Sequence, residues 1–171
     1  MSVVEVRGAH QSAETGFAVN VVPPFEQVYR ARFAELARLA SLVSGDRSAA
    51  FDIVQDAFVQ LYRRWDNVDD PVAYLRRSVV NACHSNRRRL GRRDRAVTRL
   101  SAGAPSSQSL GADEMSDVLA TLPVRQRSAI VLRHYFGLPD AEIAIVIGCA
   151  PGTVASLVHR GLAHLREVIP S

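Results

Sequence analysis

Apolar residues recur every three or four positions along two stretches near the start of the chain, which is the spacing of an amphipathic helix. The first stretch begins at Phe25, and Gly45 after it is a helix stop signal. The second covers residues 46–65 and carries acidic and amide side chains on the faces that its apolar stripe leaves open. The stripes are Phe25, Val28, Tyr29, Leu36, Leu39 and Val43, and Ala50, Ile53, Val54, Ala57, Phe58, Leu61, Tyr62 and Trp65. Two amphipathic helices are therefore predicted.

A third helix is predicted from Pro71, because the preceding run "DNVDDP" consists of turn residues and proline suits a first helical turn. After it, the sequence between residues 100 and 116 is small, polar and without apolar periodicity, which is typical of a linker. Two more helical pieces follow, broken near Pro123 and ended by Gly137. The pattern predicts an all-α fold of two small helical domains, residues 23–99 and 113–171, with a flexible linker at 100–112 and a candidate disordered tail at 1–22.

Residues 140–168 have the pattern of two short helices around a turn at Gly148. On the first helix Ile143 and Ile147 face a core, and small Ala144 lies where two helices would cross closely. The second helix begins at Pro151 and returns apolar groups to the same interior. Its predicted exposed residues are Gly152, Thr153, Ala155, Ser156, His159 and Arg160. This is the pattern of a DNA-binding helix-turn-helix, although a helical hairpin that only closes a core remains the alternative.

Composition excludes several classes of protein. The chain of 171 residues is 47% apolar, which is typical of a folded protein, and no apolar run approaches the roughly 20 residues of a membrane span. The N-terminal stretch lacks a signal-peptide pattern, so we expect a cytoplasmic protein with no membrane insertion. Cys83 and Cys149 belong to no CxxC pair or His/Cys cluster. We therefore predict structural thiols, no metal site and no cofactor.

Charge is concentrated in the third predicted helix. The net charge is +4, and all 21 basic residues are arginine, which favours acidic partners but also fits a GC-rich genome. Nine arginines lie between Arg76 and Arg99 against one acid, Asp94. Tyr74, Asn81 and other polar side chains of the same segment can stack on or bond to bases, so single-stranded or distorted nucleic acid is a candidate ligand. A solvated helix end is the alternative, and helical spacing favours packing for most of the aromatic surface at Trp65.

Two segments together resemble a known family, the extracytoplasmic function (ECF) class of bacterial RNA polymerase sigma factors. "GDRSAAFDIVQDAFVQLYRRWDNVDDPVAYLRRSVVNACHSNRRR" resembles region 2 of these proteins, and "LATLPVRQRSAIVLRHYFGLPDAEIAIVIGCAPGTVASLVHRGLAHLRE" resembles region 4. The resemblance covers most of the chain, and the order of the two motifs is more specific than either alone. It implies a non-catalytic subunit that binds core polymerase and directs promoter recognition and melting.

The resemblance also implies a role for particular residues. Polymerase docking, on the β′ clamp helices, is implied for Asp52, Gln55, Asp56 and Gln60. Binding of minus-ten DNA, with capture of an extruded base by the loop "WDNVDD", is implied for Trp65, Asp66, Asn67, Tyr74, Arg76, Arg77, Asn81, Ser85, Arg87 and Arg88. Binding of minus-thirty-five DNA is implied for Pro151, Gly152, Thr153, Ala155, Ser156, His159 and Arg160.

The implied partners are core RNA polymerase, through its β′ clamp and β subunits, promoter DNA and an anti-sigma protein. With a flexible linker, the two domains could close on each other or be clamped by the anti-sigma protein. Two other functions remain open. A stand-alone helix-turn-helix regulator would bind duplex operators without polymerase, and a helical protein-interaction adaptor would show no salt-sensitive DNA binding.

Overall fold

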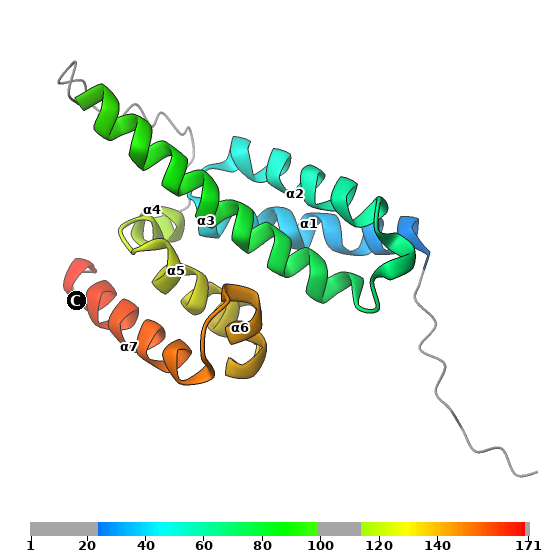
Figure 1. Cartoon of the computed structure of the whole chain (residues 1–171). Helices are drawn as coiled ribbons and strands as arrows, with labels where there is room; N and C mark the ends of the chain where they lie inside the picture. The colour runs from blue at the N-terminus through cyan, green and yellow to red at the C-terminus, as the bar shows by residue number, and fades with distance from the viewer. Residues whose placement is uncertain (1–23, 99–113, 170–171) are drawn as a thin grey trace, which may run out of the picture.

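The structure, a computed structural model, describes residues 24–98 and 114–169, with the side chains of residues 87–98 and of Glu114 outside the described part. Within those ranges every regular element is helical, as predicted (Figure 1). The predicted tail at 1–22 and linker at 100–112 lie outside the described residues. The elements are α1 (Phe25–Ser44), α2 (Arg47–Tyr62), the 3-10 turn η1 (Trp65–Asn67), α3 (Pro71–Thr98), α4 (Glu114–Ala120), α5 (Val124–Ile130), the π-helical turn η2 (Val131–Tyr135), α6 (Asp140–Ile147) and α7 (Pro151–Val168).

Helices α1, α2 and α3 pack against one another as a three-helix domain. Each contributes one apolar stripe, and burying these stripes supplies the main free energy that holds the helices together. The stripe of α2 is bordered by exposed polar residues, so this helix covers the core with one face only. The residues at the centre of the domain are Leu36, Leu39, Val43, Val54, Phe58, Leu61, Leu75, Val79 and Val80.

The ends of these helices follow from capping residues in the sequence. Gly45 ends α1 with a positive φ of 73°, a left-handed conformation that glycine adopts without a steric penalty. Asp46 then begins α2, because its Oδ1 accepts hydrogen bonds from the backbone N–H groups of Ser48 and Ala49 at 2.9 and 3.1 Å. Asp70 caps α3 in the same way, and Pro71 occupies the first turn as predicted.

Two residues of the predicted apolar stripes are instead exposed: Tyr29 of α1, at 37%, and Tyr62 of α2. Tyr62 departs further from the prediction. Its helical spacing after Phe58 placed it on the apolar stripe of α2, yet 67% of its surface is exposed, whereas Phe58 is 2% exposed. The physical reason is Phe25, whose ring lies 6.1 Å from Phe58, 5.1 Å from Tyr62 and 5.3 Å from Trp65. Because Phe25 fills the interior position, the Tyr62 ring packs edge-on from outside.

Helices α4 to α7 form the second group, with α7 packed against α5 and α6. The buried side of this group comes from the residues that sequence periodicity assigned to a core, including Ile143, Ile147, Val154 and Val158. Ile145, between the buried positions of α6, is 63% exposed. The apolar pattern of this domain therefore specifies one buried face per helix, as expected for a small helical unit.

The two groups also pack on each other. Figure 1 shows α3 between α1 and α2 on one side and α5 to α7 on the other, and both α5 and α6 contact it. Arg127 of α5 is fully buried at this junction. Its Nη1 donates to the carbonyl oxygen of Val43 at 3.1 Å, and its Nη2 donates to those of Ala120 and Leu122 at 2.7 and 3.2 Å. A charged side chain thus links the end of α1 to the end of α4.

The cap at Asp46 gives the first testable prediction. Asp46→Ala removes the acceptor of two backbone hydrogen bonds and should cost about 1 kcal/mol. In calorimetry the unfolding midpoint should fall by about 2–4 °C for a chain of this size. Asp46→Asn is the control, because asparagine caps a helix about as well as aspartate and should keep the wild-type midpoint. Equal losses in the two variants would contradict a capping role.

Candidate nucleic-acid and protein interfaces

The side chains predicted to bind polymerase share the exposed edge of α2. Asp52, Gln55, Asp56 and Gln60 are all exposed. Asp52, Asp56 and Gln60 are four residues apart and so lie one helical turn apart, and Gln55 lies three residues after Asp52. The sequence produces this edge because the apolar residues between them are used for the core. The structure therefore leaves the carboxylate and amide groups of all four residues available to a partner.

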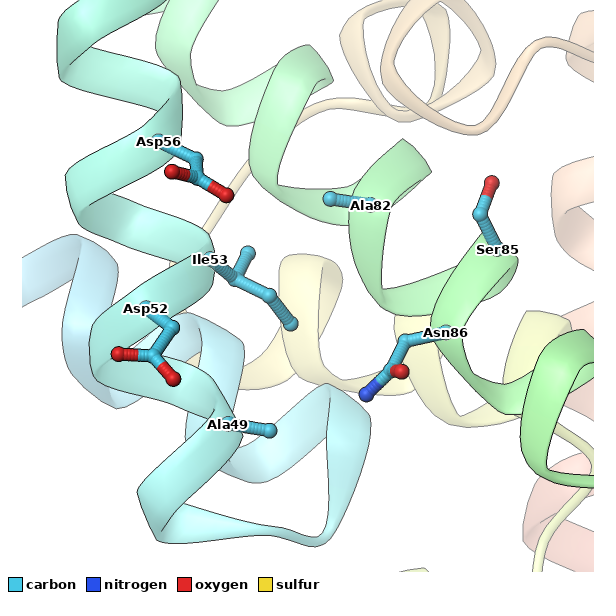
Figure 2. Close-up of a pocket in the computed structure, with 7 residues that line it drawn as sticks. All are labelled: Ala49, Asp52, Ile53, Asp56, Ala82, Ser85 and Asn86. Atoms are coloured by element: carbon cyan, nitrogen blue, oxygen red, sulfur yellow. The ribbon is translucent and has the colours of Figure 1, made fainter.

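Asp52 and Asp56 also border a cleft of about 330 Å³ between α2 and α3 (Figure 2). Ile53 lies between the two carboxylates, and the Asn86 side chain points from α3 toward α2. The lining residues are Ala49, Asp52, Ile53, Asp56, Ala82, Ser85 and Asn86. An apolar floor with acidic and amide groups at its edge suits a long cationic side chain, whose stem is apolar and whose head is charged.

The loop after α2 is built around Trp65. This residue is half-buried against Phe25, while Asp66 and Asn67 beside it are exposed. Two turn hydrogen bonds fix the backbone: Asn67 N–H donates to the Arg64 carbonyl at 2.9 Å, and Val68 N–H donates to the Trp65 carbonyl at 3.3 Å. Trp65 therefore anchors the loop, and the two polar side chains that follow it face solvent, where they can bond to a base edge.

Along α3, the residues predicted to bind minus-ten DNA do not all share one face. Arg77, Asn81 and Ser85 are exposed and four residues apart, so they form one stripe along the helix. Tyr74 is half-buried against the core. Arg87 and Arg88 belong to α3, but their side chains lie outside the described part of the chain.

Arg76 differs from its neighbours because it faces α1. Its side chain is 19% exposed, and Nη2 donates to Glu35 Oε1 at 3.1 Å, while Arg32 holds the other carboxylate oxygen at 2.7 Å. The resemblance grouped Arg76 with the DNA-binding arginines. Its partner Glu35 lies 41 residues away in the sequence, so no local pattern indicates the contact. In the structure this arginine fixes the packing of α3 on α1.

Helices α6 and α7 meet at a sharp angle, as a helix-turn-helix requires. They turn by 91° across the break between them. Gly148 makes that turn with a φ of 70°, and the N–H groups of Gly148 and Cys149 both donate to the Ala144 carbonyl, at 2.9 and 3.0 Å. The geometry therefore matches the helix-turn-helix motif, whose second helix is the recognition helix.

The outer face of α7 contains the residues predicted to bind DNA. Pro151, Gly152, Ala155, Ser156, His159 and Arg160 are exposed, and Thr153 is half-buried. Arg160 Nε donates to the Ser156 carbonyl at 3.2 Å. The structure adds Arg125, which the sequence did not indicate. This exposed residue of α5 donates to the Gly148 carbonyl at 3.3 Å, 23 residues away, and so places a cation beside the turn.

Comparisons with known proteins identify both halves of the chain. Residues 28–93 match the family model Sigma-70 region 2, and residues 112–165 match Sigma-70, region 4. The chain is 36% identical over 153 residues to the RNA polymerase sigma-E factor of Streptomyces avermitilis, with 86% of each chain covered. It is 32% identical over 152 residues to the ECF RNA polymerase sigma factor SigM of Mycobacterium tuberculosis, covering 85% of this chain and 76% of that one.

The chain belongs to the ECF sigma factors. Its fold agrees with two solved structures. The sigma factor RpoE of Bartonella quintana, in complex with the anti-sigma factor NepR, matches with a TM-score of 0.68 and 26% identity over 84% of this chain and 94% of that one. CnrH in complex with the cytosolic domain of CnrY matches with a TM-score of 0.61 and 25% identity, over 84% and 86%. Each match is longer than either domain, so each spans both.

Region 2 of this sigma factor holds the α2 edge, the Trp65 loop and α3, and region 4 holds the helix-turn-helix. Among the described helices none alone is long and apolar enough to span a membrane; α6 and α7 pass that test only as a bent pair. Within the described ranges, no group of three or more His, Cys, Asp or Glu side chains is placed to hold a metal ion.

Cys83 lies inside region 2, where its Sγ contacts the Ala40 carbonyl oxygen at 3.8 Å. Burial raises the pKa of this thiol to about 12, against smaller opposing effects of its own backbone and of Arg127. Cys149 is half-buried at the helix-turn-helix turn. Cys83 is therefore a core side chain, and its thiol has low reactivity because it stays protonated.

The Glu35–Arg76 contact gives a pH-dependent prediction. Burial works to raise the pKa of Glu35, but hydrogen bonds from Arg32 and Arg76 outweigh burial and hold this pKa below its ordinary value of 4.5. A carboxyl whose pKa is lowered by folding stabilises the protein above pH 4.5, and the contribution is lost as pH falls through the folded-state pKa. Glu35→Gln should therefore be less stable at neutral pH in urea unfolding, and this difference should shrink in acid.

The ion pair between Glu26 and Arg30 is largely exposed, so Glu26 provides the control position. Glu26→Gln should match the wild type across the same pH series. A difference between Glu35→Gln and wild type that stays constant into acid would show that the carboxylate charge is not what stabilises the α1–α3 contact.

Proposed function

We propose that this sigma factor uses three separate surfaces: the α2 edge for core polymerase, the Trp65 loop with α3 for melted minus-ten DNA, and the outer face of α7 for minus-thirty-five DNA. One observation carries the proposal. Each of the three surfaces includes polar side chains left exposed on elements whose other side is buried in a core. Such residues contribute little to folding, so their chemistry is available for binding.

For polymerase docking, the support is the geometry of Asp52 and Asp56. Two exposed carboxylates one turn apart, beside a cleft with an apolar floor, fit basic side chains projecting from a partner helix. Asn86 and Ser85 of α3 line the other wall of the same cleft. Polymerase bound at α2 would therefore lie directly beside the helix that we propose for DNA.

For promoter melting, the support is a loop that pairs a rigid anchor with two exposed polar groups. Extruding a base costs a few kcal/mol of lost stacking. Asp66 and Asn67 can bond to the edge of an extruded base, while Arg77 and the arginines beyond it on α3 can bind the phosphates of the strand. Arg76 is left out of this set, because it is used by Glu35.

For the minus-thirty-five element, the support is the N-terminal part of α7. Ser156, His159 and Arg160 lie on its exposed face, and the positive end of the helix dipole at its N-terminus favours a phosphate there. Ala155 offers only a methyl group there, so charge comes from Arg160 and from Arg125 beside the turn. A binding mode with few charged contacts should depend strongly on each of them.

The protein would act without catalysing a reaction itself, since the polymerase forms the phosphodiester bonds, and it would act in the cytoplasm, where transcription takes place. Core RNA polymerase and promoter DNA are its proposed partners. An anti-sigma protein is a further proposed partner, because the solved RpoE structure that the chain resembles contains a sigma factor bound by an anti-sigma factor.

The docking proposal is tested by run-off transcription with sigma-free bacterial core polymerase on a pool of genomic promoter fragments. Asp52→Ala/Asp56→Ala should reduce discrete transcripts at least about ten-fold, because buried charge-assisted bonds at an interface are worth about 1.5–3 kcal/mol each. Asp117→Ala/Glu167→Ala removes two exposed carboxylates from region 4 and should transcribe as the wild type does. No transcripts with wild type, but shifts of duplex DNA, would favour the stand-alone regulator.

The proposal for α7 is tested by duplex binding. Arg160→Ala should weaken binding of a minus-thirty-five fragment by about 1–3 kcal/mol and reduce its salt dependence. Arg166→Ala, near the other end of α7, removes an equal charge away from the proposed surface and should have little effect. Equal losses in both variants would indicate non-specific attraction rather than recognition by this face.

A further inference from the structure

Three glycines lie in the helix-turn-helix of region 4, and the fold requires two of them. Gly148 makes the turn with a positive φ of 70°. Gly161 packs against α5, where an added Cβ atom would lie only 2.6 Å from Ile130 Cδ1. Gly152, in the first turn of α7, meets neither condition, because its φ is not positive and an added Cβ atom would face open space. Nothing in the described part of the chain therefore requires glycine at position 152.

Glycine at position 152 weakens α7. In a helix, glycine is less stabilising than alanine because it loses more backbone freedom on folding. A side chain would fit at this exposed position of the free protein, yet none is present. Glycine is the residue that suits a helix wherever its backbone must come close to a bound molecule. The missing side chain at Gly152 is explained if the bound partner of α7 lies against this turn.

The residues beside Gly152 on the surface of α7 are also small. Ala155 lies one helical turn after Gly152, and Ser156 follows it. All three are exposed, whereas Val154 and Leu157 between and beside them are 0 and 7% exposed. We call Gly152, Ala155 and Ser156 the short-side-chain face of α7. The longer exposed side chains of the helix begin only one turn later, so the backbone can approach a partner most closely here.

The chemistry of Ala155 favours one base. Its methyl group neither donates nor accepts a hydrogen bond, so it cannot read the donor and acceptor pattern of the major groove. Among the four bases, only thymine presents an apolar group there, its 5-methyl group. Two carbon atoms make a favourable contact at about 3.5–4.0 Å. A side chain of one carbon atom reaches that distance only when the helix backbone lies close to the base edge, and Gly152 permits this approach.

We propose that the short-side-chain face of α7 recognises a thymine in the minus-thirty-five element. Ala155 packs on the 5-methyl group of this thymine, and Gly152 lets α7 come close enough for the contact. Arg160 and Arg125 supply charge for phosphates, which positions the helix without selecting a sequence. The proposal rests on the proposed function, because it assigns a base to the face of α7 that we propose for DNA.

Deoxyuridine tests the contact, because it differs from thymidine only by the missing 5-methyl group. The probe is a promoter fragment whose run-off transcript depends on this protein, with each thymine of its minus-thirty-five element replaced singly. One replacement should weaken binding of the wild-type holoenzyme about three- to five-fold in a gel shift. Ala155→Gly holoenzyme should bind the unmodified fragment more weakly by the same factor and should not respond to that replacement.

Ala163→Gly is the matched control for the deoxyuridine series. It places a glycine in the same helix two turns further on, where Ala163 is half-buried. Any general effect of a weaker α7 is therefore shared by both variants, while the Ala155 methyl group is kept. Ala163→Gly holoenzyme should still lose about three- to five-fold in binding when the critical thymine is replaced.

Gly152→Ala tests the close approach by two measurements that should change in opposite directions. The added methyl group faces open space in the free protein and favours a helix, so the unfolding midpoint should rise by about 1–3 °C. The same methyl group should hold α7 away from DNA and weaken holoenzyme binding to the promoter fragment at least about five-fold. Competition with wild type for core polymerase should show no change. Promoter binding as tight as that of wild type would contradict the close approach.

The outcomes separate this contact from the proposed function. A wild-type holoenzyme that responds to no thymine replacement would overturn the contact and leave the sigma activity intact, as would a minus-thirty-five element without thymine. An Ala155→Gly holoenzyme that still responds to the replacement would overturn the assignment to Ala155. Absence of any transcript that depends on the wild-type protein would refute the proposed function, and this contact with it.

Discussion

A buried guanidinium at the junction of the two halves of this protein bonds to both of them. Arg127 is fully buried, and such a charge is tolerated only when its donors are matched by acceptors of good geometry. Those acceptors are backbone carbonyls near the ends of α1 and α4, where helix dipoles favour a cation. The short α4 gains a C-terminal partner in this way, and Gly45, whose Cβ would meet the guanidinium at 3.1 Å, leaves room for it.

Local periodicity predicted the parts of the structure that depend on neighbours in sequence. Ile143 and Val154 are buried and Gly148 makes the turn between them, as predicted. A pattern of only a dozen residues is enough to specify these three positions. The exposed edge of α2 followed from the same rule. Tyr62 was predicted wrongly for an instructive reason: its spacing fits a core, but Phe25, at the far end of another helix, occupies that position.

Partners distant in sequence were beyond prediction. Arg76 and Arg77 are neighbours with the same chemistry, yet one bonds to Glu35 and the other faces solvent. Composition does not show which of Arg76, Arg77 and Arg127 bond inside the fold, since every arginine in a basic chain is a candidate for binding nucleic acid. Only the fold shows which cations are used internally. The cleft between Asp56 and Asn86 belongs to the same class, because it exists only where α2 and α3 lie side by side (Figure 2).

Trp65 is the only tryptophan in the chain, and it anchors the loop after α2. Its indole lies against Phe25 in one place and half in solvent, with Tyr62 also packed on that phenylalanine. Ultraviolet emission from this molecule above the tyrosine band therefore originates from one defined position. The protein carries its own optical label at the loop, and the wavelength and polarisation of that light follow the surroundings of a single side chain without any dye being attached.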